Sequence, residues 1–314
     1  MSSQYAELHV LSNFTFLRGA SHPEELVETA AKLGYAALAI TDECSMSGIV
    51  RAHSAAKAFG LRKLIIGSEF QLPSGRKLVA LAQNRNGYAA LCQLISNARR
   101  AAEKGRYELT RAAFEDGLPD CLVLWVPDQA FSLDVEDHWL RETFRDRLWI
   151  AVELLADGRQ REQLAKLREE GRRLKLPLVA CGDVHMHCRS RRILQDAVTA
   201  IRHGTTIDNA GFNLYPNGER HLRSLEVLQR IYPAELLAET IQIASAIDFS
   251  LDELRYEYPD ELVPDGETPA KYLRNLTVEG ARRRLPGGVP HKVTSLVELE
   301  LALIADLEYE PFFL

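Results

Sequence analysis

The chain has 314 residues, of which 46% are hydrophobic and 26% are charged, and its formal net charge is −6. These values favour a globular protein of one large or two smaller domains, and the acidic balance argues against an overall nucleic-acid-binding character, which is usually basic. The sequence has no apolar run of membrane-spanning length, no secretory signal pattern and no cysteine framework. Five cysteines without framework spacing favour a reducing cytoplasm.

Apolar runs typical of strands alternate with helical patterns in the first part of the chain. We predict strands at residues 6–12, 36–41, 62–70, 76–84, 121–127, 148–155 and 177–185. Helices are predicted at residues 22–35, 48–60, 87–105 and 161–176, with a polar helical stretch between the fifth and sixth strands. This alternation predicts βαβ units and a mostly parallel sheet. About seven strands before residue 190 favour a closed or nearly closed (β/α) barrel, with an open doubly wound sheet as the alternative.

The pattern changes beyond about Leu194, where most segments are helical. The stretch "YEYPDELVPDGETP" at residues 256–269 is rich in proline and acidic residues and is predicted to be a linker. The last segment, residues 295–314, starts as a helix and ends on an apolar "FFL". We expect the chain to be a piece of a longer protein.

Histidines and carboxylates follow several predicted strands. Their positions at strand ends are His9, Asp42, Glu69, Asp183 and His185. The carboxyl ends of parallel barrel strands meet at one opening, and these side chains are typical ligands of Zn, Mn or Fe. Taken singly, each residue is more often a helix cap or a packed polar group. Cys181 and Cys188 lack a second C-x-x-C pair, so a zinc ribbon is not favoured.

Five stretches of the sequence resemble the PHP (polymerase and histidinol phosphatase) family in order and spacing. They are "ELHVLSNFTFLRGAS", "ALAITDECSMSGIVRAH", "IIGSEF", "KLVALAQNRNGYAALCQLIS" and "VACGDVHMH". The chain is similar to the domain that opens bacterial C-family DNA polymerases such as the polymerase III alpha subunit, and most similar to the error-prone, mutagenesis-cassette type. The resemblance implies an α/β fold: a distorted (β/α)7 PHP barrel at residues 1–255, then a linker and the mostly helical beginning of a polymerase palm at residues 256–314.

In its intact form the PHP family holds three metal ions with about nine side chains, and the resemblance implies which of them this chain keeps. The retained positions are His9, Asp42, Glu69, Asp183 and His185. The substituted positions are Leu11, Arg18, Glu43, Lys77, Arg99, Pro127 and Asp157. Loss of donors and gain of positive charge weaken a metal cluster. We therefore expect a metal-free pocket in which Arg18 and Lys77 pair with the acids Asp42, Glu69 and Asp183.

The resemblance implies that the chain is the N-terminal scaffold of an error-prone DNA-directed DNA polymerase in damage-induced translesion synthesis in the cytoplasm. The complete protein would use Mg²⁺ and contact DNA, a sliding clamp and accessory proteins, whereas this piece would have no catalytic residues. We expect DNA contacts at Arg189, Arg191 and Arg192. The alternative is a metal-dependent phosphoesterase or 3′-5′ exonuclease that uses Zn or Mn at the retained ligands. A stand-alone small-molecule phosphatase is disfavoured.

Overall fold

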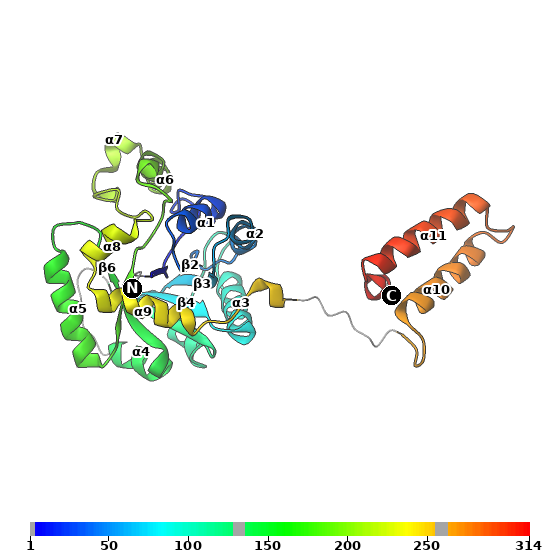
Figure 1. Ribbon diagram of the computed structural model, residues 1–314, viewed down its shortest axis with the longest axis horizontal. Coiled ribbons are helices and arrows are strands. Elements are labelled where there is room, and N and C mark those ends of the chain that lie inside the picture. Colours follow the sequence, from blue (N-terminus) through cyan, green and yellow to red (C-terminus); the bar gives the residue numbers. More distant parts are fainter. Residues whose placement is uncertain (1–3, 128–135, 255–262) are drawn as a thin grey trace. The chain divides into compact units, whose positions relative to one another are not determined.

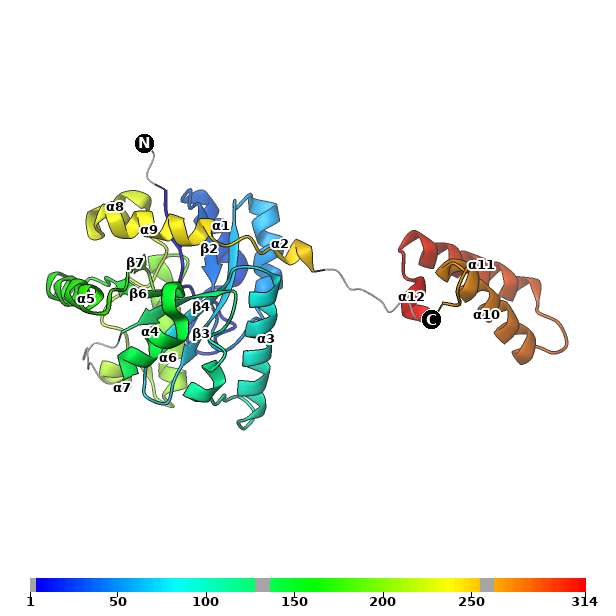
Figure 2. The same cartoon turned by 90° about the horizontal axis from the view of Figure 1, so that it is seen from below.

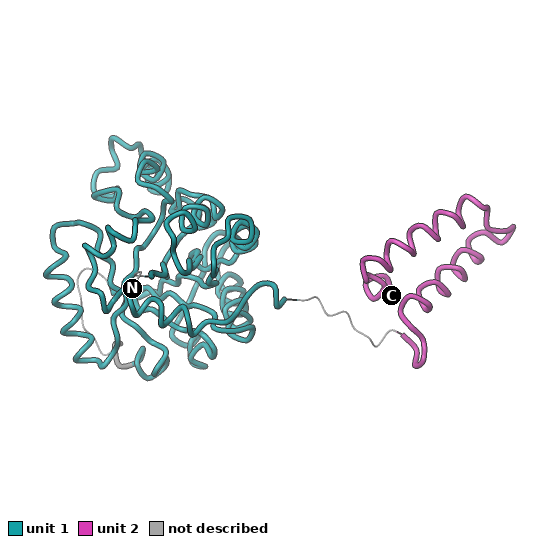
Figure 3. Tube along the Cα trace, viewed as in Figure 1, with its two compact units in different colours: residues 1–254 teal, residues 255–314 magenta. Residues whose placement is uncertain are grey.

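A computed structural model of the chain describes residues 4–127, 136–254 and 263–314. The chain divides into two compact units, residues 1–254 and 255–314, which are shown in different colours in Figure 3. The first unit contains all the strands of the sheet, and the described residues of the second contain three helices. Each unit is described by itself.

The first unit is built around a seven-stranded sheet whose strands follow one another in chain order. The strands are β1 (Ala6–Glu7), β2 (Ala37–Ile40), β3 (Leu64–Gln71), β4 (Lys77–Ala82), β5 (Cys121–Val126), β6 (Leu148–Glu153) and β7 (Leu178–Cys181). All neighbours pair in parallel except β4, which is antiparallel to both β3 and β5. A parallel bridge between Val10 and Val184 joins the two edges of the sheet. The predicted seven-stranded, nearly closed barrel is confirmed.

Helices surround these strands, as Figures 1 and 2 show from two directions. They are α1 (Pro23–Lys32), α2 (Ile49–Phe59), α3 (Arg85–Arg100), α4 (Glu136–Phe144), α5 (Gln160–Leu174), α6 (Arg192–Arg202), α7 (Ile207–Ala210), α8 (Leu225–Ile231) and α9 (Ala234–Ser245). Their ends follow from local chemistry. Pro23 occupies the first turn of α1, where its missing N–H costs nothing. Asn84 caps α3 by accepting hydrogen bonds from the N–H groups of Asn86 and Gly87.

The antiparallel direction of β4 comes from a tight turn after β3. The N–H of Leu72 donates to the carbonyl of Arg76, and the N–H of Gly75 donates to the carbonyl of Leu72. Gly75 has φ +84°, a left-handed conformation that glycine adopts without a steric penalty. The turn replaces the helix of an ordinary βαβ unit, so β4 begins at the end of the barrel where β3 ends.

Alternate residues of the strands pack into two separate apolar cores. On β4, Val79 and Leu81 belong to a core that collects residues from all seven strands together with Ile243 and Ile247 around α9. Leu78 and Ala80 belong to the other core, between the strands and the surrounding helices. This period-two alternation is expected of a strand with different neighbours on its two faces. Helix α9 packs against β1 and β7 and thereby fills one end of the barrel.

The second unit consists of α10 (Pro269–Arg284), α11 (His291–Asp306) and α12 (Glu310–Phe313) among the described residues. Half of the predicted linker, residues 256–262, lies outside the described residues, and its last residue, Pro269, is the first residue of α10. The reason is that proline suits the first turn of a helix, here behind the capping side chain of Thr268. The described helices include none that is long and apolar enough for a membrane span.

Candidate functional site at the barrel mouth

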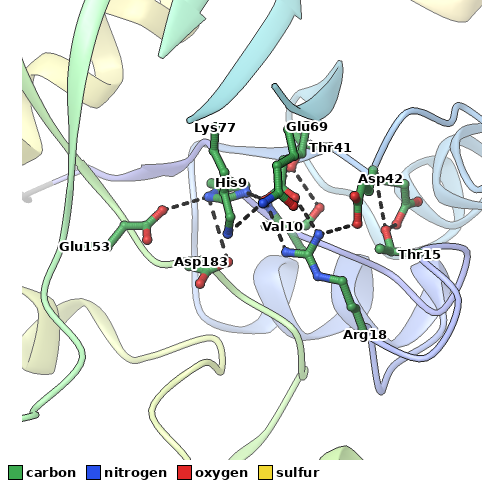
Figure 4. A network of polar contacts seen from close by, with 12 residues as sticks. His9, Val10, Thr15, Arg18, Thr41, Asp42, Glu69, Lys77, Glu153 and Asp183 are labelled. Carbon is green, nitrogen blue, oxygen red and sulfur yellow. Dashed lines mark hydrogen bonds and ion pairs between the residues drawn. The ribbon is translucent and has the colours of Figure 1, made fainter. Parts of the chain in front are cut away.

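The candidate site lies at the carboxyl ends of the parallel strands. Glu69 is near the end of β3 and Glu153 is the last residue of β6. Lys77 is the first residue of β4 and pairs in register with Gln71 on β3. Because β4 runs against its neighbours, its first residue reaches the mouth at which the other strands end. Figure 4 shows these side chains converging with His9, Arg18 and Asp183.

Glu69 is the centre of this cluster and its side chain is fully buried. Arg18 Nη1 lies 2.5 Å from Glu69 Oε1, and His9 Nε2 lies 2.9 Å from Glu69 Oε2. Lys77 Nζ lies 3.6 Å from Glu69 Oε2. Burial alone would raise the pKa of Glu69, but the charges of Lys77 and Arg18 lower it well below its usual value. Glu69 is therefore a buried carboxylate held ionised by the protein's own cations.

His9 lies between two carboxylates. Its Nδ1 is 2.8 Å from Glu153 Oε1 and 4.0 Å from Asp183 Oδ1, while its Nε2 contacts Glu69. Burial would lower the pKa of His9, but the hydrogen bonds to Glu153 and Glu69 raise it to about 10. His9 is therefore an imidazolium at neutral pH, with both ring nitrogens acting as donors.

Asp183 and His185 form the second part of the cluster. His185 Nε2 lies 2.9 Å from Asp183 Oδ1, and Arg220 Nε lies 2.7 Å from Asp183 Oδ2. Burial opposes ionisation of Asp183, yet a hydrogen bond from His185 and the charges of Arg220 and Lys77 hold the pKa of this carboxyl well below its usual value. Burial lowers the pKa of His185 to about 4, so this ring is neutral at pH 7. The guanidinium of Arg220 also lies over the ring of Tyr215, 4.2 Å from its centroid.

No cation from the described part of the chain forms an ion pair with Asp42, contrary to our expectation. Its carboxylate accepts hydrogen bonds of 2.7 Å from the N–H and hydroxyl of Ser12 and from the hydroxyl of Thr15. Burial raises the pKa of Asp42, and these hydrogen bonds oppose that effect. Asp183 is paired with Arg220, and it also interacts electrostatically with Lys77. The groups that contact these two carboxylates come from other segments of the chain: Ser12 and Thr15 for Asp42, and Arg220 for Asp183.

The substituted positions fall into two groups: those that lie in or next to the cluster, and those whose side chains contact other parts of the protein. Arg18 and Glu43 meet in an ion pair of 2.5 Å, with Lys77 nearby on Glu69, and Leu11 is fully buried. Arg99 is elsewhere: it donates to the backbone carbonyls of Cys44 and Glu43. Pro127 and Asp157 line a cavity of about 490 Å³ at the mouth, which Lys77, Glu153 and Asp183 also line. Asp157 itself pairs with Arg159, at 3.4 Å, rather than with the cluster.

The three arginines expected to contact DNA lie at the start of α6 and in the short 3-10 helix before it. Each has an acidic partner: Arg189 pairs with Glu219 at 3.2 Å, Arg192 with Asp196 at 3.3 Å, and Arg191 with Glu25. Their positive charge is therefore partly offset within the protein, and their role in DNA binding stays a prediction.

Sequence reasoning missed two members of the cluster, Glu153 and Arg220. Glu153 carried a usable signal, since it ends the strand "LWIAVE" at the same edge as the other acids. Arg220 carried none, because it lies in a loop far along the chain from Asp183. Of the candidate ligands, His9, Glu69 and Asp183 offer atoms within 4.8 Å of one another, a spacing that suits one metal ion.

The chain matches a family model and is similar to longer proteins of known name. Residues 7–150 match the family model described as "PHP domain". The chain is 57% identical over 316 residues to an error-prone DNA polymerase of Dechloromonas aromatica, and 53% identical over 312 residues to one of Pseudomonas aeruginosa. These alignments cover 99% of this chain but only 31% and 30% of the relatives, so the chain spans about a third of their length.

Among solved structures, the chain resembles a putative metal-dependent phosphoesterase from Bifidobacterium adolescentis, with a TM-score of 0.46 and 17% identity. That match covers 73% of this chain and 96% of the other. Residues 7–150 of the chain therefore contain a PHP domain, and nearly the whole chain is similar to about a third of the length of error-prone DNA polymerases.

Proposed function

We propose that this chain is the PHP scaffold of an error-prone DNA-directed DNA polymerase, and that ion pairs stabilise its barrel mouth in place of metal ions. The observation that carries the proposal is that Arg18, Lys77 and His9 all contact one buried carboxylate, that of Glu69. These groups occupy both oxygens of the residue that would have to bind a metal.

The charges of the cluster support this proposal. The acids are Glu43, Glu69, Glu153 and Asp183, and the cations are Arg18, Lys77, Arg220 and protonated His9. Four negative charges thus face four positive charges without a metal ion. A divalent ion would add two charges to this balanced cluster and would require a lone pair that an imidazolium lacks. The residues therefore do not fit the three-metal set of the family as they stand.

The remaining functions are proposed for the complete polymerase. It would extend a primer with Mg²⁺ during damage-induced translesion synthesis and repair in the cytoplasm, and it would contact DNA, a sliding clamp and accessory proteins. The helices α10 to α12 would lead into its palm. The support is the identity of more than half of the aligned residues to error-prone polymerases about three times as long.

Metal analysis of the purified 314-residue chain tests the metal-free mouth. After dialysis against Zn²⁺- and Mn²⁺-free buffer we expect well under one equivalent of either metal, by mass spectrometry of the acid-digested protein. One tightly held equivalent that disappears in Asp183→Ala and remains in the distant control Glu235→Gln would contradict the proposal. The polymerase part is tested separately, by primer extension with the complete protein.

A metal-dependent phosphoesterase is the second candidate, because His9, Glu69 and Asp183 have the spacing of a one-metal site. If it were correct, Mn²⁺ would support nuclease activity on single-stranded DNA that falls in Asp183→Ala and His185→Ala but not in Glu235→Gln. If the scaffold proposal is correct, wild type and all three variants show the same background.

A further inference from the structure

Positive side chains gather at one end of the second unit, around the turn that joins α10 to α11. The two helices run in opposite directions, as Figure 1 shows, and Arg274 of α10 pairs with Glu298 of α11 at 2.5 Å. The last turn of α10 therefore lies at the same end of this hairpin as the first turn of α11. We call this end the basic tip, and its basic residues are Arg282, Arg283, Arg284, His291 and Lys292.

The positive charge of the basic tip is not balanced by acids of the chain. No Asp or Glu lies between Glu279 and Glu298 in the sequence. All five basic residues are exposed, and within the described part of the chain no ion pair joins the arginines or the lysine of the tip to a carboxylate. The arginines at positions 189–192 differ in this respect, because each has an acidic partner.

Helix stability explains only part of this cluster. The three arginines are in the last turn of α10, where positive charge suits the negative end of the helix dipole. His291 and Lys292 are in the first turn of α11, the positive end, where cations are unfavourable and acidic residues are absent. Like charges that are close together also repel one another. An anionic partner would offset both of these costs.

The surroundings of the tip favour a phosphate backbone over a lipid surface as that partner. Helices that bind lipid surfaces combine basic residues with large apolar ones. Among the described residues, no large hydrophobic side chain is exposed between Leu276 and Leu296. The turn also contains Gly287 and Gly288, which let the backbone approach another molecule closely. Binding of a phosphate backbone needs the cations alone.

We propose that the basic tip is a DNA-contacting surface, which binds backbone phosphates of a duplex without reading its sequence. The choice of DNA among polyanions rests on the function proposed above, in which the chain belongs to a polymerase. Arginine suits this task because its guanidinium group forms paired hydrogen bonds with phosphate oxygens. Adjacent residues of a helix point about 100° apart, so we expect about two of the three arginines to reach one duplex.

Fluorescence anisotropy of a short labelled DNA duplex tests this inference with the 314-residue chain. The tip variant combines Arg282→Gln, Arg283→Gln and Arg284→Gln, because glutamine keeps a high helix propensity. Each phosphate contact contributes about 0.9 to the slope of log affinity against log salt concentration. We expect the tip variant to bind about tenfold or more weakly than wild type at 50 mM NaCl, with a slope smaller by about 2.

The matched control combines Arg100→Gln, Lys104→Gln and Arg106→Gln, which removes the same charge from an exposed segment of the first unit. This control should bind the duplex like wild type. Equal losses of affinity in the tip variant and the control would overturn the inference, as would wild-type affinity in the tip variant. Binding of phosphatidylserine vesicles through the tip, without binding of the duplex, would overturn it in favour of a membrane surface.

Lysine acetylation of the wild-type chain provides a test that needs no substitution. Saturating duplex should slow acetylation of Lys292, whereas exposed Lys271, at the start of α10, should react at an unchanged rate. Lack of protection at Lys292, or equal protection of both lysines, would overturn the inference. Primer extension by the complete protein would still occur in that case, so the proposed function would stand, whereas loss of primer extension would refute that function alone.

Discussion

Replacing Arg18 by methionine is the sharpest test of the ion-pair cluster. Arg18 is buried and bonds both Glu69 and Glu43 at 2.5 Å. Methionine keeps most of the side-chain volume but removes the charge, so a fully buried carboxylate loses the cation that lies closest to it. Removing one member of a buried ion pair typically costs about 3–5 kcal/mol.

We expect the lower end of this range for Arg18→Met, about 3 kcal/mol, because Glu69 keeps contacts to His9 and Lys77. For a unit of this size that loss corresponds to a decrease of about 6 to 12 °C in the melting temperature. The double variant Arg18→Met with Glu69→Gln should be less unstable than the sum of its single variants, because the unpaired buried charge is then gone.

Urea unfolding followed by tryptophan fluorescence measures the effect. The three tryptophans, at positions 125, 139 and 149, are all in the first unit, so the signal reports the barrel alone. Arg168→Met is the matched control, because its pair with Glu235 lies on the surface, and such pairs contribute at most about 1 kcal/mol. A loss of less than 1 kcal/mol for Arg18→Met, or simple additivity in the double variant, would refute the reasoning about the cluster.

Four further predictions concern pH and packing. The folded pKa of His9 is raised to about 10, so the contribution of His9 to stability is complete below the unfolded pKa of about 6.5 and is lost as pH rises through 10. The urea midpoint should therefore fall between pH 7 and 10.5 for the wild type and change less for His9→Gln. Glu153→Gln removes a hydrogen-bonded carboxylate from His9 and so lowers the folded pKa of His9; the same alkaline decrease should then be smaller and should end at lower pH, and an unchanged profile would count against this contact. On the acid side, the lowered pKa of His185, about 4, predicts that its contribution is lost as pH falls from 6.5 to 4, and His185→Gln should reduce that slope. Gly182→Ala would place a Cβ 2.3 Å from the buried Glu7 carboxylate and should cost about 2–3 kcal/mol by thermal unfolding; a cost below 1 kcal/mol would mean that Glu7 moves freely.

Local patterns in the sequence determined the elements of the barrel. The alternation of apolar runs with helical periodicity placed all seven strands, because strand and helix periods are set by backbone geometry and are visible in any short window. Pro23 in the first turn of α1 and Gly60 at the end of α2 are helix ends that follow from local conformational preferences. The acids at strand ends could also be placed together, since parallel strands finish at one edge of a barrel.

The contact partners of Asp42 and Asp183 were decided by the tertiary structure alone. Arg220 reaches Asp183 from 37 residues away, and Ser12 and Thr15 satisfy Asp42 so that no cation is needed there. Lys77 joins the cluster only because a turn reverses β4. A carboxylate attracts any donor that the fold brings within about 3 Å, and that choice depends on distances between segments far apart in the chain, which sequence periodicity does not encode.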